Sequence, residues 1–192
     1  ALARVDGKVV FIEGAVPGDV VDVQLKKNKT DWAEGFVVAY RSYSEDRVQP
    51  FCAHFGVCGG CQWQMLPYAK QLLYKQQQVT DNLTRIGRIQ LPDIQPIIGA
   101  SQTELYRNKM EYTFATKKYI PSEEFRALKA AGADFSNQPG AAGFHVRGFF
   151  DKVVEVDTCH LQEEPTNLIR KMVAKYALDH DLPYYDVKQH TG

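Results

Sequence analysis

The spacing of four cysteines constrains the fold of this chain more than any other feature of its sequence. Cys52, Cys58 and Cys61 lie within the stretch FCAHFGVCGGCQW, and Cys159 follows after 97 intervening residues. One clustered triplet and one distant thiol complete a tetrahedral set of ligands only when the chain folds. Such a set suits a 4Fe–4S cluster or a structural zinc site. Unliganded buried thiols are the remaining alternative.

The residues around the triplet favour a cluster without excluding zinc. Three glycines between the cysteines leave space for a bulky cofactor and let backbone N–H groups turn towards it. Four apolar side chains beside them can form the dry shell that such a cofactor needs. These are Phe51, Phe55, Val57 and Trp63. His54 and His160 are candidates for a mixed zinc site, although a histidine in this position is more often an ordinary loop residue.

The sequence contains no sign of secretion or membrane insertion. It has 192 residues, 44% of them hydrophobic and 24% charged, which suits one ordinary globular domain or two small ones. No apolar run approaches the roughly 18 residues of a membrane-spanning helix. The start, ALARVDGKVV, lacks both an initiator Met and the zones of a signal peptide. We therefore expect a cytoplasmic protein whose cysteines are ligands or reactive thiols rather than disulfides.

The net charge excludes a polycationic nucleic-acid binder, because 23 basic residues balance 23 acidic ones. The charge is uneven, however. Residues 51–120 carry eight basic and four acidic residues, a net of +4, whereas residues 1–50 carry −1 and residues 121–192 carry −3. The middle of the chain is thus the best electrostatic candidate for contact with a polyanion, although a weak one.

Residues 1–50 predict short β-strands separated by turns. Strand-forming runs occupy residues 9–12, 20–25 and 32–40, and a polar hairpin tip lies between the last two. Short strands at intervals of roughly 8 to 12 residues are typical of a small barrel or sandwich. Because only three or four strands are visible, we expect a first strand upstream of Ala1.

Residues 51–192 predict a mixed α/β segment. Helices are expected at 67–86, 121–132 and 165–180, and strands at 106–119 and within 143–156. Ser122 is the expected N-cap of the second helix, and the stretch GADFSNQPGAAG after that helix is expected to be a loop. The third helix is amphipathic, and we expect its apolar face to point inward. That face comprises Leu168, Ile169, Met172, Val173 and Tyr176.

Several stretches together resemble a known enzyme family. They are GKVVFIEGAVPGDVV, FCAHFGVCGGCQWQMLPYAKQLLYKQQQV, YRNKMEYTF, GFHVRG and VDTCH. The chain resembles bacterial RNA uridine-C5 methyltransferases, in the iron–sulfur branch that acts mainly on large-subunit ribosomal RNA. The resemblance covers nearly the whole chain except residues 120–142, and the cysteine motif with the helix after it is its most specific part.

The resemblance implies an α+β architecture of two domains. Residues 1–50 would form a TRAM domain, an OB-fold-like RNA-binding barrel that lacks its first strand. Residues 51–192 would form an incomplete α/β central domain with an insertion near 120–142. The family's Rossmann-like catalytic domain would be absent. The four cysteines would hold a 4Fe–4S cluster, which aerobic purification can remove. We expect a monomer whose partner is RNA, with ribosomal RNA favoured.

The family's reaction requires a thiolate that adds to C6 of uracil, so that C5 attacks the methyl group of S-adenosylmethionine. The target base must also leave its stack. All four cysteines are assigned to the cluster, and no glycine-rich cofactor loop follows a strand. We therefore expect a fragment that is inactive alone, with S-adenosylmethionine bound only by the full-length enzyme.

RNA recognition is the function left to these residues. The strongest candidates are polar, basic and aromatic residues of the central segment, which suit phosphate, base-edge and stacking contacts. They are Arg107, Asn108, Lys109, Phe144, His145 and Arg147. The barrel adds Lys8, Lys26, Lys27 and Lys29, with Trp32 or Phe11 as stacking surfaces. The alternatives are an exposed strand end, simple strand packing and a solvated hairpin tip.

Two other functions fit parts of the pattern. A stand-alone RNA-binding module stabilised by zinc or a cluster would need no catalytic domain. A radical S-adenosylmethionine enzyme with a TRAM domain would also carry clustered cysteines. Those enzymes use C-x3-C-x2-C and leave one iron open, whereas five residues separate the first two cysteines here and Cys159 can fill the fourth position.

Overall fold

The structure, a computed structural model, describes residues 1–135 and 140–192 and divides into two compact units. The first unit comprises residues 1–50 and 63–99, and the second comprises residues 51–62 and 100–192. The loop that carries the cysteine triplet therefore shares a unit with Cys159. Part of the expected insertion, residues 136–139, lies outside the described residues. No helix in the described part of the chain is long and apolar enough to cross a membrane.

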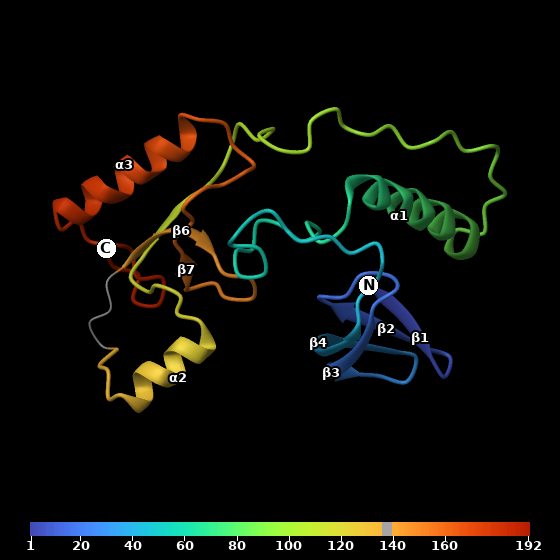
Figure 1. Cartoon of the computed structure of the whole chain (residues 1–192), viewed down its shortest axis with the longest axis horizontal. Coiled ribbons are helices and arrows are strands. Elements are labelled where there is room, and N and C mark those ends of the chain that lie inside the picture. The colour runs from blue at the N-terminus through green and yellow to red at the C-terminus, as the bar shows by residue number, and fades with distance from the viewer. Residues whose placement is uncertain (136–139) are drawn as a thin grey trace. The chain divides into compact units, whose positions relative to one another are not determined.

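The first unit contains a four-stranded sheet in the order β1-β2-β4-β3. Its strands are β1 (Leu2–Val5), β2 (Lys8–Glu13), β3 (Val20–Asn28) and β4 (Trp32–Ser42) (Figure 1). Strand β1 was not predicted, because it is too short to show a clear alternation. An Asp-Gly pair at positive φ, the usual signal for a tight hairpin, turns the chain from β1 into β2. Strands β2 and β4 pair in parallel, and the other neighbours pair antiparallel.

A buried ion pair fastens the loops of this unit. The Asp19 side chain is fully buried and lies 2.6 Å from an Arg47 guanidinium nitrogen. Its carboxylate also accepts the backbone N–H groups of Val16 and Ser44, at 2.8 and 2.9 Å. Burial by itself would raise the pKa of Asp19, but the hydrogen bonds from Arg47 and the two backbone groups outweigh burial and lower it.

The predicted helix at 67–86 is confirmed, with a change of helical type near its end. Helix α1 covers Tyr68–Asp81, and a π-helical segment, η1, continues over Asn82–Ile86. Residues 63–99, which the sequence analysis assigned to the second domain, pack with the first unit. One reason is an ion pair of 2.8 Å between Lys70 on α1 and Asp46.

The second unit contains a three-stranded antiparallel sheet in the order β5-β6-β7. Its strands are β5 (Thr113–Ala115), β6 (Ala141–His145) and β7 (Val153–Val154). The strand predicted over 106–119 is wrong in its extent, since only β5 forms. The reason is that the backbone N–H groups of Leu105 and Arg107 bind the carbonyls of His160 and Leu161 instead of a sheet neighbour, at 2.9 and 2.8 Å.

The two remaining helices form where the sequence predicts them, but with two local differences. Helix α2 covers Ser122–Ala130 and helix α3 covers Thr166–Asp179. Ser122 is the first helical residue of α2, and Pro121 takes the N-cap position without a side-chain cap bond. The prediction of Ser122 as the cap is therefore wrong, because a residue with helical backbone cannot adopt cap geometry.

The face of α3 that is buried is not the apolar face predicted to point inward. Its five large apolar side chains are between 50% and 62% exposed. The helix instead buries Asn167, Arg170 and Ala177. The prediction failed because hydrogen bonds decide the orientation: the two polar side chains bind backbone groups near Cys159.

Candidate functional site

Tight turns compact the loop of residues 51–62. The N–H of Phe55 donates to the carbonyl of Cys52 at 3.1 Å, and the N–H of Cys58 donates to the carbonyl of His54 at 3.0 Å. Gly56 adopts a φ of +89°, which glycine takes without the steric cost of a Cβ atom. These turns fold back the five residues between Cys52 and Cys58, so the chain is not extended between the two cysteines.

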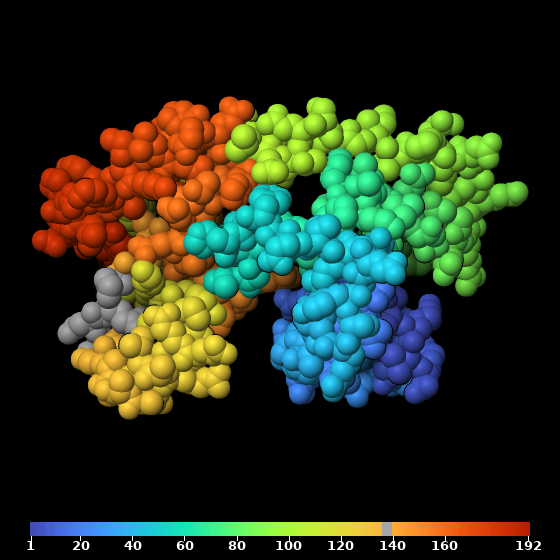
Figure 2. All heavy atoms as spheres, in the orientation of Figure 1, coloured from blue at the N-terminus to red at the C-terminus, as the bar shows by residue number. Residues whose placement is uncertain are grey.

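The same loop is fastened to the end of β6. Cys58 forms an isolated β-bridge with Val146, and the N–H of Gly59 donates to the carbonyl of His145 at 3.0 Å. A Cβ atom at Gly59 would lie 3.1 Å from that carbonyl oxygen, so glycine permits the close approach. In Figure 2, the cyan atoms of the loop lie against the orange atoms of β6 and β7.

Cys159 lies near the triplet in space, although 97 residues separate it from Cys61 in the sequence. It is buried in a small apolar cluster with Val156 and Leu161, and Cys58 and Cys61 pack against this cluster. The side chain of Asn167 holds the Cys159 backbone through two bonds. Its Oδ1 accepts the Cys159 N–H at 2.9 Å, and its Nδ2 donates to the Cys159 carbonyl at 3.1 Å.

The electrostatics of Cys58 reflect its burial and the nearby thiols. Burial raises the pKa of the Cys58 thiol above its ordinary value, and Cys61, Cys159 and Cys52 each raise it further. The N–H of Gly60, which donates to the Cys58 sulfur at 3.4 Å, opposes this shift. The Cys58 thiol is therefore protonated at neutral pH, and a metal that binds it must displace the proton. None of the four described cysteines forms a disulfide.

The arrangement does not form a ready site for a single metal ion. Within residues 1–135 and 140–192, no group of three or more His, Cys, Asp or Glu side chains is placed to hold one. Nε2 of His54 accepts the N–H of Asp157 at 3.1 Å, so it is engaged within the protein. His160 stacks edge-on against Phe51, with 5.2 Å between the ring centroids. The histidines proposed for a mixed zinc site thus have other contacts.

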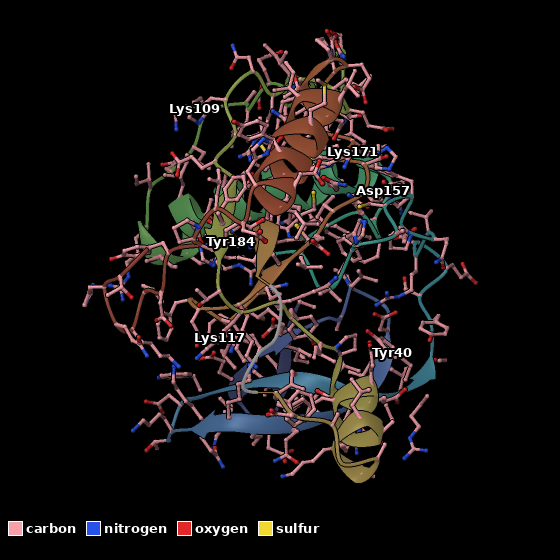
Figure 3. The ribbon with its side chains drawn as sticks, turned by 90° about the vertical axis from the view of Figure 1, so that its left-hand side faces the viewer. Tyr40, Lys109, Lys117, Asp157, Lys171 and Tyr184 are labelled. Atoms are coloured by element: carbon pink, nitrogen blue, oxygen red, sulfur yellow. The ribbon has the colours of Figure 1, made fainter. Side chains whose placement is uncertain are left out.

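A buried arginine that was not predicted as a site residue, Arg170, lies close to the cysteine loops. Arg170 donates to the carbonyl of Asp157 at 2.9 Å, and its guanidinium lies 5.7 Å from the centre of the Tyr112 ring. The side chain of Asp157 pairs with Lys171 at 2.8 Å (Figure 3). The sequence did contain a signal for this buried face. The spacing of Asn167, Arg170 and Ala177 places them together on one face of α3, opposite the exposed apolar residues of that helix.

The structure places the predicted RNA-binding segment Arg107–Lys109 beside the Cys159 loop. The backbone N–H of Arg107 binds the carbonyl of Leu161 at 2.8 Å, while the side chains of all three residues are exposed. Lys109, labelled in Figure 3, pairs with Glu111 at 2.6 Å. Both partners are more than three-quarters exposed, so this pair is weak and can be exchanged for a phosphate contact.

The residues predicted within GFHVRG have different surroundings. Phe144 is half-buried, packs against the Cys159 cluster and lies 5.0 Å from the Tyr112 ring centre. This position favours the alternative of simple packing for Phe144. His145 is exposed and contacts the hydroxyl of Thr113 at 3.1 Å, and the Arg147 side chain is also exposed.

The predicted barrel residues lie in the first unit, where three of the four lysines have partners. Lys8 donates to Asn28 at 2.7 Å, Lys26 pairs with Glu13 at 3.3 Å and Lys27 pairs with Glu34 at 3.0 Å. Lys29 is exposed. The rings of Phe11 and Trp32 meet edge to face with centroids 6.3 Å apart, and both remain partly exposed. The sheet thus presents an aromatic pair of the kind on which bases stack.

Comparisons with known proteins agree with this part of the structure. Residues 1–38 match the TRAM domain family. The whole chain is 46% identical to a Bacteroides thetaiotaomicron protein named "Uncharacterized RNA methyltransferase" and 42% identical to one of the same name from Porphyromonas gingivalis. Over 97% of the chain, it is 36% identical to a similarly named protein of Chlorobaculum tepidum. The predicted TRAM domain and the predicted likeness to RNA methyltransferases are confirmed at this level.

The chain spans about two-fifths of the length of these relatives. It covers 41% of the first two proteins and 38% of the third. More than half of each relative therefore has no counterpart among these 192 residues.

Proposed function

We propose that this chain is the RNA-binding and cluster-holding part of an S-adenosylmethionine-dependent RNA (uracil-5-)-methyltransferase that acts on large-subunit ribosomal RNA. The observation that carries the proposal is the similarity of the whole chain to proteins named RNA methyltransferases, starting with 46% identity. The TRAM match at residues 1–38 supports RNA binding. The cysteine motif and its likeness to the iron–sulfur branch support the choice of uridine C5 and of ribosomal RNA.

Cys52, Cys58, Cys61 and Cys159 are the residues that would hold a 4Fe–4S cluster. Their fit rests on the donor set: four thiols of one unit, three of them packed in an apolar cluster, with the other three thiols all raising the pKa of Cys58. A four-iron cluster takes one thiolate per iron, so its ligands stand farther apart than four ligands on one zinc ion. The choice of a cluster over zinc rests on the cysteine spacing and on the likeness to the iron–sulfur branch.

When bound, the cluster would supply structural cross-linking of two distant segments. The residues of this chain would bind and orient the RNA: the exposed segment Arg107–Lys109 lies directly beside the Cys159 loop. Methyl transfer needs a free thiolate, and the four cysteines of this chain are all assigned to the cluster. The chain would therefore be inactive alone, and the remainder of the enzyme would provide the nucleophile and bind S-adenosylmethionine, the methyl donor.

Metal analysis of anaerobically purified protein tests the cofactor. We expect a broad brown absorbance and about four irons per chain, and a Cys159→Ser variant should lose most of both. Stoichiometric zinc without iron would reject the cluster. For the activity, the protein encoded by the complete reading frame should methylate C5 of a uridine in large-subunit ribosomal RNA. Methylation at another atom, or of transfer RNA alone, would reject the proposed specificity.

A further inference from the structure

The second unit contains a large cavity for which neither the sequence analysis nor the comparisons provide a role. Its volume is about 900 Å³, and one wall is helix α2. The segment from β5 to α2 and the loop before β7 form much of the rest. Helix α2 belongs to the stretch 120–142, which contributes none of the motifs that carry the family resemblance.

The lining of the cavity holds more basic than acidic side chains. Four cationic side chains line it, against a single acidic one, Asp186. The cations are Lys117, Lys118, Arg126 and Lys152. Lys118 pairs with Glu155, and Lys117, labelled in Figure 3, acts on the carboxylates of Asp151 and Asp186. Because the cations still outnumber the acidic groups around them, the cavity attracts an anion.

Aromatic rings accompany these charges. The rings of Tyr119 and Phe149 lie with their centroids 6.1 Å apart, and Lys152 is positioned 4.8 Å from the centre of the Phe149 ring. Phe149 is 43% exposed and Phe125, on α2, is 41% exposed. A cation beside an exposed ring suits a ligand that combines a phosphate with a flat base, because the ring stacks on the base while the cation binds the phosphate.

A second, smaller cavity connects this region with a residue predicted to bind RNA. It has a volume of about 200 Å³ and shares Thr116, Lys117 and Asp186 with the larger cavity. His145 lines it. A strand of RNA in contact with His145 would therefore be next to the basic cavity.

We propose that the basic cavity beside α2 binds an unpaired nucleotide of RNA, with Arg126 and Lys152 on its phosphates and Phe149 stacked on its base. This inference rests on the proposed function, since it takes RNA as the substrate. It adds a second contact region within the same unit as the Cys159 loop. Unpaired RNA is favoured over a duplex because only an unstacked base presents a free face to an aromatic side chain.

The test measures binding of a fluorescent single-stranded RNA dodecamer of mixed sequence as a function of salt. Each phosphate contact on a single strand contributes about 0.7 to the slope of log K against log salt concentration. Arg126→Gln with Lys152→Gln should therefore lower the slope by about 1.4. The control, Lys129→Gln with Lys175→Gln, removes the same charge from residues outside the cavity and should leave the slope unchanged.

A stacking variant separates base contact from charge. Phe149→Ala should weaken binding about 5- to 150-fold, because one stacked base contributes about 1–3 kcal/mol. Phe149→Tyr, which keeps a ring, should restore most of the affinity. Circular dichroism melts of each variant exclude unfolding as the cause.

The outcomes distinguish this inference from the proposed function. If the unmodified protein binds no RNA, the proposed function fails and the inference fails with it. If it binds RNA and the cavity variants bind equally well, only the inference is overturned. Equal losses for single-stranded and fully paired RNA would also overturn it, since a paired base cannot stack on Phe149. Equal competition by a free nucleoside monophosphate and by the dodecamer would replace RNA by a small nucleotide as the ligand.

Discussion

The amide side chain of Asn167 bonds to both backbone groups of Cys159, with Oδ1 accepting the N–H at 2.9 Å and Nδ2 donating to the carbonyl at 3.1 Å. Both residues are buried, so neither backbone group can turn to water instead. Helix α3 thus fixes the conformation of the one cysteine that lies far from the others in sequence. Asn167 is a positioning residue for the fourth thiol.

Replacing Asn167 with alanine should destabilise the second unit. The change leaves two buried backbone groups without partners, and each such group costs about 1–3 kcal/mol. We expect a lower urea midpoint by circular dichroism and faster labelling of Cys159 by a thiol reagent. Asn82→Ala, at an exposed position in η1, is the control and should change stability by less than about 0.5 kcal/mol. Equal effects of the two substitutions would contradict the positioning role.

The ion pair of Asp19 and Arg47 should make the first unit sensitive to acid. The pKa of Asp19 is lowered in the folded state, whereas in the unfolded chain it is about 3.9. The stabilisation is therefore fully present above the unfolded pKa and is lost as pH falls through the lower folded pKa. Asp19→Asn should remove about 3–5 kcal/mol at neutral pH, because it leaves the Arg47 charge without its partner.

The fluorescence of Trp32 and Trp63 follows this transition, since both tryptophans belong to the first unit. The asparagine variant should also show a weaker dependence of stability on pH between about 5 and 2. Asp31→Asn, at an exposed position, serves as the control. An unchanged acid transition in Asp19→Asn would show that another carboxylate is responsible.

Gly35 should not tolerate a side chain. A Cβ atom there would lie 2.5 Å from the carbonyl oxygen of Gln24 and 2.6 Å from a methyl group of Val23, both on the paired strand β3. Gly35→Ala should therefore cost about 3 kcal/mol, at the upper end of the usual range for overpacking. Gly7→Ala meets nothing within 4 Å and strains only a positive φ, at about 1–2 kcal/mol. Urea titration followed by tryptophan fluorescence compares the two, and a smaller loss in Gly35→Ala would contradict the packing.

The segment beside the Cys159 loop should contribute to RNA affinity. Arg107→Ala with Lys109→Ala should weaken binding to a ribosomal RNA hairpin and reduce the salt slope by roughly 1.4 if each cation binds one phosphate of its unpaired loop. Arg85→Ala with Lys175→Ala removes the same charge from two exposed helical ion pairs and is the matched control. Unchanged affinity in the first variant would reject the assignment.

Local signals predicted most of the elements, whereas contacts between distant residues were hidden from the sequence. The apolar periodicity and the positions of the prolines were sufficient to predict α1, α2 and α3, because a helix depends mainly on residues that are close in sequence. The apolar pattern of α3 gave the wrong buried face, because the bonds from Asn167 and Arg170 to the cysteine loops outweigh it. The segment before β5 was taken for a strand because its backbone partners lie more than 50 residues away.

The residues of the candidate site also differ in whether the sequence could predict them. The sequence pointed to the four cysteines, since three of them form a compact motif and Cys159 is the only other cysteine of the chain, and the structure brings them into one unit. The buried Arg170 and the basic cavity could not be predicted, because each combines residues from several separate segments.

The position of Cys159 also determines when the thiol set is complete during synthesis. Cys61 leaves the ribosome 98 residues ahead of Cys159, and Asn167 follows eight residues later. Because a chain is synthesised at about 5–20 residues per second, Cys159 is added roughly 5 to 20 seconds after Cys61. Throughout that interval three thiols are exposed to oxidants and to stray metal ions. The nascent chain therefore needs reducing conditions if all four thiols are to stay free until Cys159 has been made.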